Sequence, residues 1–285
     1  MIPAEFEYTR PSSIAEAVAA IAEAGEDGKI LGGGQSLIPI LRLRLAYPST
    51  IIDVSRVDDM RGVREDGDAI LIGSMTTHHD VMHDALVVEH APLIAQATET
   101  VADPQVRHRG TFGGALAHAD PAGDLGAVAL ALGCEFVANG ANGERRIPAS
   151  EFFLDYLTTA LSPDEVLTAI RVPKLGAGWS SHYEKFNRVA QAWSIVAVAA
   201  LVKRENGSIS EARIGLTNMG STPLRSSAVE QALAGADVTD EAVSAAAEHA
   251  ADGTNAPSDL SGKSDYREHL ARVLTKRAVL SAASS

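Results

Sequence analysis

The first fifty residues change from a helical to an extended pattern of apolar positions. Apolar side chains in residues 14–22 recur at the three- and four-residue spacing of one helix face. Ser13 precedes this run and Glu16 lies three residues further on, a capping-box pattern that predicts the start of a helix. The glycines of residues 25–28 predict its end. Residues 29–31 then form a short apolar run typical of a buried strand.

The middle of the chain repeats both patterns. Apolar runs predict strands at 50–54, 69–73, 134–138 and 166–172. Helical spacing predicts helices at 77–85, 88–101 and 124–132. In the last of these, Asp124 is the expected acidic N-cap and Gly133 the expected stop.

The last third of the chain is different in kind. Residues 194–203 and 208–216 are rich in β-branched residues, and Asn206-Gly207 between them predicts a hairpin. Helices are expected at 226–233, 240–250 and 264–280. Pro173, Gly176 and Gly178 mark the linker between the two parts. There are no repeats and no strict βαβ alternation, so the pattern predicts an α+β protein.

Composition and charge narrow the function. The 285 residues include 24 Lys and Arg against 37 Asp and Glu, a net charge of -13. An acidic surface argues against nucleic acid or an anionic membrane as partner. No apolar run reaches the roughly 20 residues of a transmembrane helix. The start of the chain lacks the basic and apolar regions of a signal peptide, so a cytoplasmic location is expected.

Cys134 is the single cysteine. One thiol cannot form an intrachain disulfide, a four-thiolate zinc site or a self-contained iron–sulfur cluster. If this protein handles electrons, it therefore needs an organic cofactor or the cluster of a partner chain. A buried small hydrophobic residue is the expected role of Cys134 itself.

Two glycine-rich segments carry the chemistry. Residues 32–36 (Gly-Gly-Gly-Gln-Ser) follow a predicted strand, and residues 110–114 (Gly-Thr-Phe-Gly-Gly) form a second such segment. Glycines let backbone N–H groups approach a diphosphate closely, and Ser36 and Thr111 add hydroxyl groups. Neither segment has the spacing of a Rossmann fingerprint or a Walker loop. Taken singly, each could equally be a tight turn.

Four ordered segments together resemble a known family, the FAD-binding medium subunits of molybdenum hydroxylases. They are 31–39 and 111–124 for the two flavin loops, 185–193 at the start of the C-terminal domain, and 261–267 before a basic helix. The similarity spans nearly the full length. Segments 117–121 and 191–193 look closest to the aerobic carbon monoxide dehydrogenase branch.

The resemblance implies an N-terminal FAD-binding domain of the vanillyl-alcohol-oxidase (PCMH) type at 1–176 and a smaller α+β domain at 179–285. It implies that the first loop wraps the diphosphate and that Asp124 accepts hydrogen bonds from cofactor hydroxyls. Leu161 and Lys185 would lie beside the flavin ring, and Trp193 would cover one flavin face. The implied cofactor-binding positions are Ile30, Leu31, Gly32, Gly33, Gly34, Gln35, Ser36, Leu37, Val101, Thr111, Phe112, Gly113, Gly114, Ala115, Ala117, Asp124, Leu161, Lys185 and Trp193.

Two positions depart from the family pattern. Phe112 stands where isoleucine or valine is usual, and Ala115 where asparagine or aspartate is common. These departures leave the backbone contacts intact and remove the usual side chain at position 115.

The family also implies a role and partners. A large molybdenum-cofactor subunit and a small iron–sulfur subunit would form a dimer of heterotrimers with this chain. FAD would collect electrons from the clusters and pass them to an external acceptor, expected to be a quinone; membrane association would come through partners. The alternatives are a sister enzyme acting on an N-heterocycle or aldehyde, a stand-alone flavin oxidoreductase, or a flavin-free scaffold. No catalytic residue and no metal ligand is assigned to this chain.

Other candidates have plainer interpretations. His78, His79 and His83 share a predicted helix, but without a full ligand set they are expected to be solvated. His118 and Asp120 could relay protons, although packing of the loop is the favoured interpretation. Arg42 and Arg44 could offset the charge of a diphosphate or meet a partner subunit, and a solvated face is an equal alternative. The basic end is expected to face solvent; its residues are Arg267, Arg272, Lys276 and Arg277.

Overall fold

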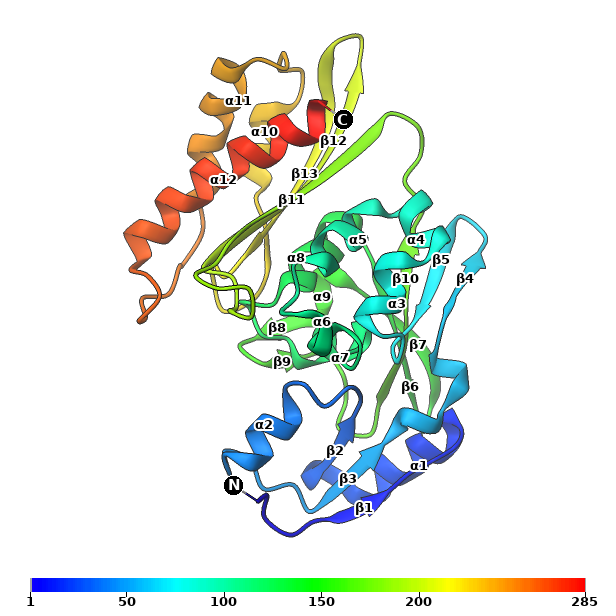
Figure 1. The fold of residues 1–285 in the computed structure, drawn as a ribbon. Coiled ribbons are helices and arrows are strands. Elements are labelled where there is room, and N and C mark those ends of the chain that lie inside the picture. The colour runs from blue at the N-terminus through cyan, green and yellow to red at the C-terminus, as the bar shows by residue number, and fades with distance from the viewer. Residues whose placement is uncertain (1, 285) are drawn as a thin grey trace.

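The computed structural model describes residues 2–284, so the outermost residues of the two expected domains lie outside the described part. The N-terminal region is a small parallel sheet in the order β1-β3-β2, at one end of the molecule in Figure 1. Its strands are β1 (Glu7–Thr9), β2 (Gly28–Leu31) and β3 (Thr50–Asp53). Helix α1 (Ile14–Ala24) packs on β2 and β3 through Ala17 and Ile21, and α2 (Leu37–Arg42) follows the first glycine segment.

A five-stranded antiparallel sheet forms the middle of the molecule, in the order β4-β5-β10-β6-β7. Its strands are β4 (Val63–Asp66), β5 (Ala69–Gly73), β6 (Glu135–Gly140), β7 (Gly143–Pro148) and β10 (Val166–Pro173). The helices between β5 and β6 are α3 (His78–His83), α4 (Ala85–His90), α5 (Pro92–Glu99), α6 (Pro104–Arg107), α7 (Phe112–His118) and α8 (Asp124–Leu132). Helix α9 (Ala149–Phe152) and the hairpin β8 (Phe153–Asp155) and β9 (Thr158–Thr159) come between β7 and β10.

The C-terminal region is an antiparallel sheet in the order β11-β12-β13-β14. Its strands are β11 (Trp179–Phe186), β12 (Val196–Glu205), β13 (Ser208–Thr217) and β14 (Leu224–Arg225). Helices α10 (Ser227–Leu233), α11 (Asp240–Ala247) and α12 (Ser264–Ser284) lie on its outer side (Figure 1). The opposite face contacts α5 and α8, so this sheet is covered by helices from both parts of the chain.

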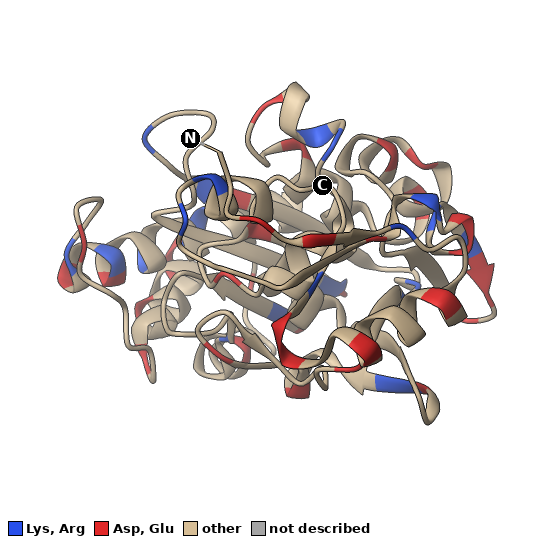
Figure 2. Cartoon of the chain, turned by 90° about the horizontal axis from the view of Figure 1, so that it is seen from below, with Lys and Arg blue, Asp and Glu red and all other residues tan. Residues whose placement is uncertain are grey.

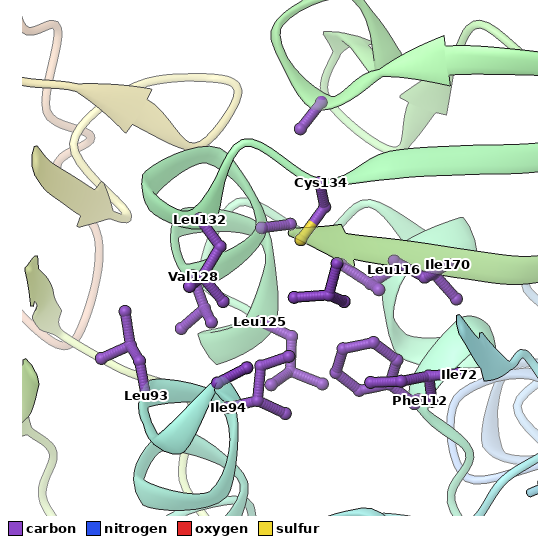
Figure 3. Packing of buried hydrophobic residues seen from close by; sticks show 14 of the residues in the cluster. Ile72, Leu93, Ile94, Phe112, Leu116, Leu125, Val128, Leu132, Cys134 and Ile170 are labelled. Carbon is purple, nitrogen blue, oxygen red and sulfur yellow. The ribbon is translucent and has the colours of Figure 1, made fainter. Parts of the chain in front are cut away.

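The hydrophobic core crosses between the two parts. Residues of α5, α7, α8 and the middle sheet pack around Phe112 and Leu125 in Figure 3. The same cluster includes Tyr183, Ala199 and Leu201 from the C-terminal sheet. Removing these side chains from water favours the joined arrangement by about 25 cal/mol per Å² of apolar area. The contact between the two parts is therefore an extension of the core.

Most predicted elements form at the predicted places. Ser13 accepts a hydrogen bond from the Glu16 amide at 3.2 Å, while the Glu16 carboxylate bonds Ser12. The Asn206-Gly207 turn has positive φ at both residues, as a tight hairpin requires.

Two expectations about helices are wrong in detail. The helices expected at 77–85 and 88–101 are three, because the chain is extended at Asp84 and leaves helical geometry at Ala91, before Pro92. A residue before proline is disfavoured in the helical region, which explains the second break. Asp124 is the first residue of α8 and not its N-cap, which is Gly123.

Acidic and basic residues are interspersed along the part of the chain seen from below (Figure 2). In Figure 2, acidic residues occupy the outer loops and helices, and Lys and Arg stand among them. No helix within residues 2–284 combines the length and apolar character needed to cross a bilayer.

Candidate cofactor site

A cavity of about 630 Å³ lies where three segments meet. The first glycine loop (32–37) forms one wall, and the second glycine loop (110–117) forms another. Lys185 and residues 191–193 come from the C-terminal region. The strand end of β2, the start of α7 and the β11–β12 connection are thus brought together from distant parts of the chain.

The first glycine loop presents unpaired backbone donors. Within the described residues, the N–H groups of residues 33–36 have no protein acceptor. Gly34 adopts φ +75°, a conformation that a side chain disfavours. Because groups of backbone N–H donors attract anions, this loop is suited to a phosphate group.

The two glycine loops touch through their backbones. A Cβ at Gly33 would lie 2.1 Å from the Arg109 carbonyl oxygen and 2.7 Å from the Cα of Gly110. A Cβ at Gly113 would lie 2.2 Å from the Cβ of Ser74. Gly33 and Gly113 are therefore required for protein segments to pack closely, whether or not a ligand is bound.

Thr111 joins the second loop to helix α7. Its hydroxyl caps the helix by accepting from the Gly114 amide at 3.2 Å. The same oxygen would be 3.1 Å from a Cβ at Gly32, so it also lies against the first loop.

Asp124 is the centre of a buried polar network. One carboxylate oxygen accepts from the Tyr183 hydroxyl at 2.8 Å and the Ser194 hydroxyl at 2.7 Å. The other accepts from the Lys185 ammonium at 2.8 Å, and Lys185 also donates to the Thr100 carbonyl at 3.0 Å. Burial, reinforced by the charge of Asp124, raises the pKa of Tyr183 well above its ordinary value, so its hydroxyl stays a donor. A carboxylate has about four acceptor positions, and these donors occupy three of them. Asp124 also lines the cavity.

Trp193 stands at the cavity mouth on the segment between β11 and β12. Its side chain is 52% exposed, and its ring faces Gly123, where an added Cβ would lie 3.7 Å from the indole. Gln191 on the same segment donates to Asp103, and Ser194 donates to Asp124, so the segment is fastened to the N-terminal part of the chain.

Two histidines line the cavity. His78 is buried, and desolvation, with the Arg107 charge adding, lowers its pKa to about 4. Its Nδ1 has no hydrogen-bond partner. Burial also lowers the pKa of His118 against the opposing effect of Asp120. Both imidazoles are thus held in the neutral form near neutral pH.

The structure brings together nearly all of the implied cofactor positions. All of them line the cavity except Leu31 and Phe112, and Phe112 belongs to the hydrophobic core. Other lining residues were not among the implied positions. They include Met75 and Val106, which lie outside the glycine-rich and family-like segments, and Gly110, Gly123 and Gln191, which lie inside them. His78 also lines the cavity and was not predicted to do so. The sequence shows that it lies in the first turn of a helix. Nothing in the sequence showed that this helix start faces the cavity.

Other candidate residues have structural surroundings. Cys134 is buried, and burial raises the pKa of its thiol far above the ordinary value, as a structural role implies. Asp120 accepts from the Ala122 amide at 2.9 Å within its loop. Arg42 and Arg44 are exposed.

Two predictions of solvent exposure are wrong. His78 is buried, unlike His83, because the first turn of α3 packs under the second glycine loop. Arg267 is fully buried, because the start of α12 packs on β12. Among residues 2–284, no three His, Cys, Asp or Glu side chains gather closely enough to hold a metal ion.

The donor set fits FAD. Free amides at one end of the cavity suit a diphosphate, and the open acceptor position of Asp124 suits a hydroxyl group. Lys185 presents a buried cation where an electron-rich ring system would be stabilised. The cavity of about 630 Å³, lined by residues of both glycine loops, leaves room for a dinucleotide.

Comparisons with known proteins agree with this fit. Residues 4–175 match the family model described as the FAD binding domain in molybdopterin dehydrogenase. Residues 181–282 match the carbon monoxide dehydrogenase flavoprotein C-terminal domain. The chain therefore belongs to the FAD-binding medium subunits of the molybdenum hydroxylases, a family of oxidoreductase subunits.

Individual relatives extend over the full length. The chain is 41% identical to the carbon monoxide dehydrogenase medium chain of Hydrogenophaga pseudoflava, covering 98% of this chain and 97% of that one. It is 33% identical to the 6-hydroxypseudooxynicotine dehydrogenase complex subunit alpha of Paenarthrobacter nicotinovorans, covering 99% and 96%. A solved carbon monoxide dehydrogenase from Hydrogenophaga pseudoflava superposes with a TM-score of 0.97 at 43% identity, covering 100% of this chain and 99% of that chain.

Proposed function

We propose that this chain is the flavin subunit of an aerobic carbon monoxide dehydrogenase. The observation that carries the proposal is the similarity to carbon monoxide dehydrogenase medium chains along the full length. The protein works with a large molybdenum-cofactor subunit and a small iron–sulfur subunit, in a dimer of heterotrimers, and an external quinone accepts the electrons. Its place is the cytoplasm, with any membrane contact made through partners. The functional division remains residues 1–176 and 179–285.

The residues of this chain hold and orient the cofactor. The amides of 33–36 bind the diphosphate, and Thr111 and Gly114 bring the second loop to it. Asp124 accepts from a cofactor hydroxyl with its remaining acceptor position, while Leu161 and Lys185 lie beside the flavin ring. Trp193 covers one face of that ring and excludes water there.

The bound FAD supplies the two-electron redox chemistry of the subunit. The chain contributes position and charge. Lys185 is held by Asp124 and by the Thr100 carbonyl, so its ammonium is preorganised and favours negative charge on the neighbouring ring. His78 and His118 are neutral and add no competing charge at the cavity wall.

Cofactor binding is tested on the full chain alone. FAD binds noncovalently, so acid precipitation releases the yellow colour into the supernatant. Flavin retained by the denatured protein would contradict this mode of binding, with His118 then the candidate attachment site.

The substrate is tested on the assembly purified with its partner chains, under anaerobic conditions. Carbon monoxide is expected to bleach the flavin absorbance near ~450 nm, a band that belongs to the cofactor's own chemistry. Nicotine, caffeine and glyceraldehyde serve as alternative substrates, because relatives named for them are 34–35% identical to this chain. Bleaching by one of these and not by carbon monoxide would move the protein to a sister branch and leave the FAD role standing.

A further inference from the structure

We propose that Arg267 is a positioning residue for the cofactor site: it holds the main chain at Ile195, two residues after Trp193, and thereby holds Trp193 over the flavin. The inference rests on the proposed placement of Trp193 against FAD. It gives a role to the 261–267 segment, whose residues do not line the cofactor cavity.

Trp193 lacks a packed environment that would hold it. Half of its side chain is exposed, and its ring meets the Cα side of Gly123. A side chain with so few fixed neighbours takes its position from its backbone. The main chain on either side of Trp193 therefore decides where the indole lies.

That main chain is anchored directly after Trp193. The Ile195 carbonyl accepts from the buried Arg267 guanidinium and from the Asn218 amide at 3.3 Å. The Asn218 amide also donates to the Ser194 carbonyl at 2.8 Å. On the other side, the Ile195 amide donates to the Phe186 carbonyl at 2.8 Å, where β12 begins. Of the groups that bond this main chain, Arg267 is the one that carries a charge.

Arg267 is itself held in one place. It is fully buried, and a second guanidinium nitrogen donates to Asp259 at 2.7 Å. Asp259 also accepts from the amides of Ser261 and Gly262, which closes the turn before α12. This turn and the first turn of α12 make one rigid unit that presents Arg267 to Ile195.

Stability alone does not explain a buried arginine here. Taking the Arg267 guanidinium out of water is costly, and the attraction to its partner Asp259 is weakened because Asp259 is half exposed to solvent. The Nε of Arg267 is buried without a partner, which adds to that cost. A charge-assisted bond to one chosen carbonyl does offer directional control that an apolar contact lacks.

The test uses contact quenching, because an indole stacked on a flavin suppresses the flavin emission. Full-length Arg267→Met, Trp193→Leu and parent proteins are compared at equal FAD occupancy, measured by absorbance. Leu274→Ala is the matched control, since Leu274 is buried on the same helix in the cluster that contains Ile195, but its apolar side chain cannot donate to the Ile195 carbonyl. Arg267→Met is expected to lose most of the quenching, approaching Trp193→Leu, while Leu274→Ala keeps the quenching of the parent.

A second readout needs no FAD. In a Trp179→Phe background, Trp193 is the remaining tryptophan, because the chain has two. The anisotropy of its emission is expected to fall in Arg267→Met and in Asp259→Asn, but not in Leu274→Ala. Asp259→Asn tests the same link if Arg267→Met does not fold.

The outcomes separate the two claims. Unchanged quenching and unchanged anisotropy in both link variants, or an equal change in Leu274→Ala, would overturn the positioning role. Failure of the parent to bind FAD would instead overturn the proposed function, and the anisotropy would still decide the role of Arg267. Arg267→Lys, which keeps the charge on a single donor nitrogen, is expected to retain part of the anisotropy that Arg267→Met loses.

Discussion

At the scale of the residue, Gly33 shows how the absence of a side chain can serve a cofactor site through protein packing as well as through the ligand. Its missing Cβ leaves room for the Arg109 carbonyl, so the two loops can lie together. Sequence reasoning assigned this glycine to cofactor approach alone. The structure adds a contact between protein segments that precedes any ligand.

Gly33→Ala is therefore expected to push the loops apart and weaken FAD binding by about 1–3 kcal/mol, the usual cost of overpacking. FAD affinity is measured by titration followed by absorbance. Gly176→Ala is the control, because a Cβ at Gly176 meets no heavy atom within 4 Å. Equal FAD affinity in both variants would show that the loops need not touch.

His78 makes stability depend on pH. Its pKa is about 4 in the folded chain and 6.5 when unfolded, so the unfolded chain binds the extra proton between these values. The contribution of His78 to the free energy of unfolding is fully present above its pKa in the unfolded chain. It is lost as the pH falls toward its pKa in the folded chain. From about pH 7.5 to about pH 5, the free energy of unfolding is expected to drop by about 2 kcal/mol through this group.

Urea unfolding at the two pH values measures this loss. His78→Gln is expected to reduce it, while His83→Gln, on the exposed side of the same helix, leaves it as in the parent. A pH dependence that persists unchanged in His78→Gln would assign it to other groups.

At the scale of the element, the start of α7 combines folding and binding. Thr111 caps this helix and lies against the first glycine loop. Thr111→Ala is expected to lower the free energy of unfolding by about 1 kcal/mol, as loss of an N-cap does, and also to weaken FAD binding.

Thr239→Ala is the matched control, because Thr239 caps α11 in the same way. Thr239 lies outside the cavity walls, so its loss should reduce stability and leave FAD affinity unchanged. Thr111→Ser retains the hydroxyl and should behave like the parent in both measurements. If the two alanine variants lowered FAD affinity equally, the effect of Thr111 would be one of stability alone.

Local signals predicted elements well where neighbours in sequence make the bonds. The Ser13 cap, the Asn206-Gly207 turn and the stop at Gly133 all depend on residues a few positions apart. The sequence prediction placed the first break between helices at residues 86–87, whereas the structure has it at Asp84. There the aspartate caps the next helix by accepting from the Leu86 amide at 2.9 Å.

At the scale of the whole molecule, the two parts of the chain meet closely at Gly215. A Cβ there would lie 2.3 Å from the Ala127 carbonyl oxygen, so β13 lies directly on α8. Asp124 is in the first turn of α8, and its partner Lys185 is on β11 of the same sheet. The spacing of sheet and helix therefore sets the spacing of this ion pair.

Gly215→Val is expected to separate β13 from α8, lower the unfolding temperature and reduce FAD occupancy together. Breaking one side of a buried ion pair costs about 3–5 kcal/mol, and stretching it costs part of that. Differential scanning calorimetry and flavin absorbance measure the two effects. Ser210→Ala, at an exposed position on the same strand, should change neither. Full FAD occupancy in a destabilised Gly215→Val would show that the cavity does not depend on this contact.

The sequence by itself determined the α+β class, most elements, the two glycine loops and the family, because these depend on local spacing and on segments that can be compared in order. Tertiary structure alone decided which charges are buried. Asp124 meets Lys185 and Ser194 across 61 and 70 residues, and Arg267 meets Ile195 across 72. On a helix pattern, Asp124 and Arg267 look like a cap and a solvated cation. Their burial depends on a sheet that covers them after the chain has folded, and no local pattern contains that information.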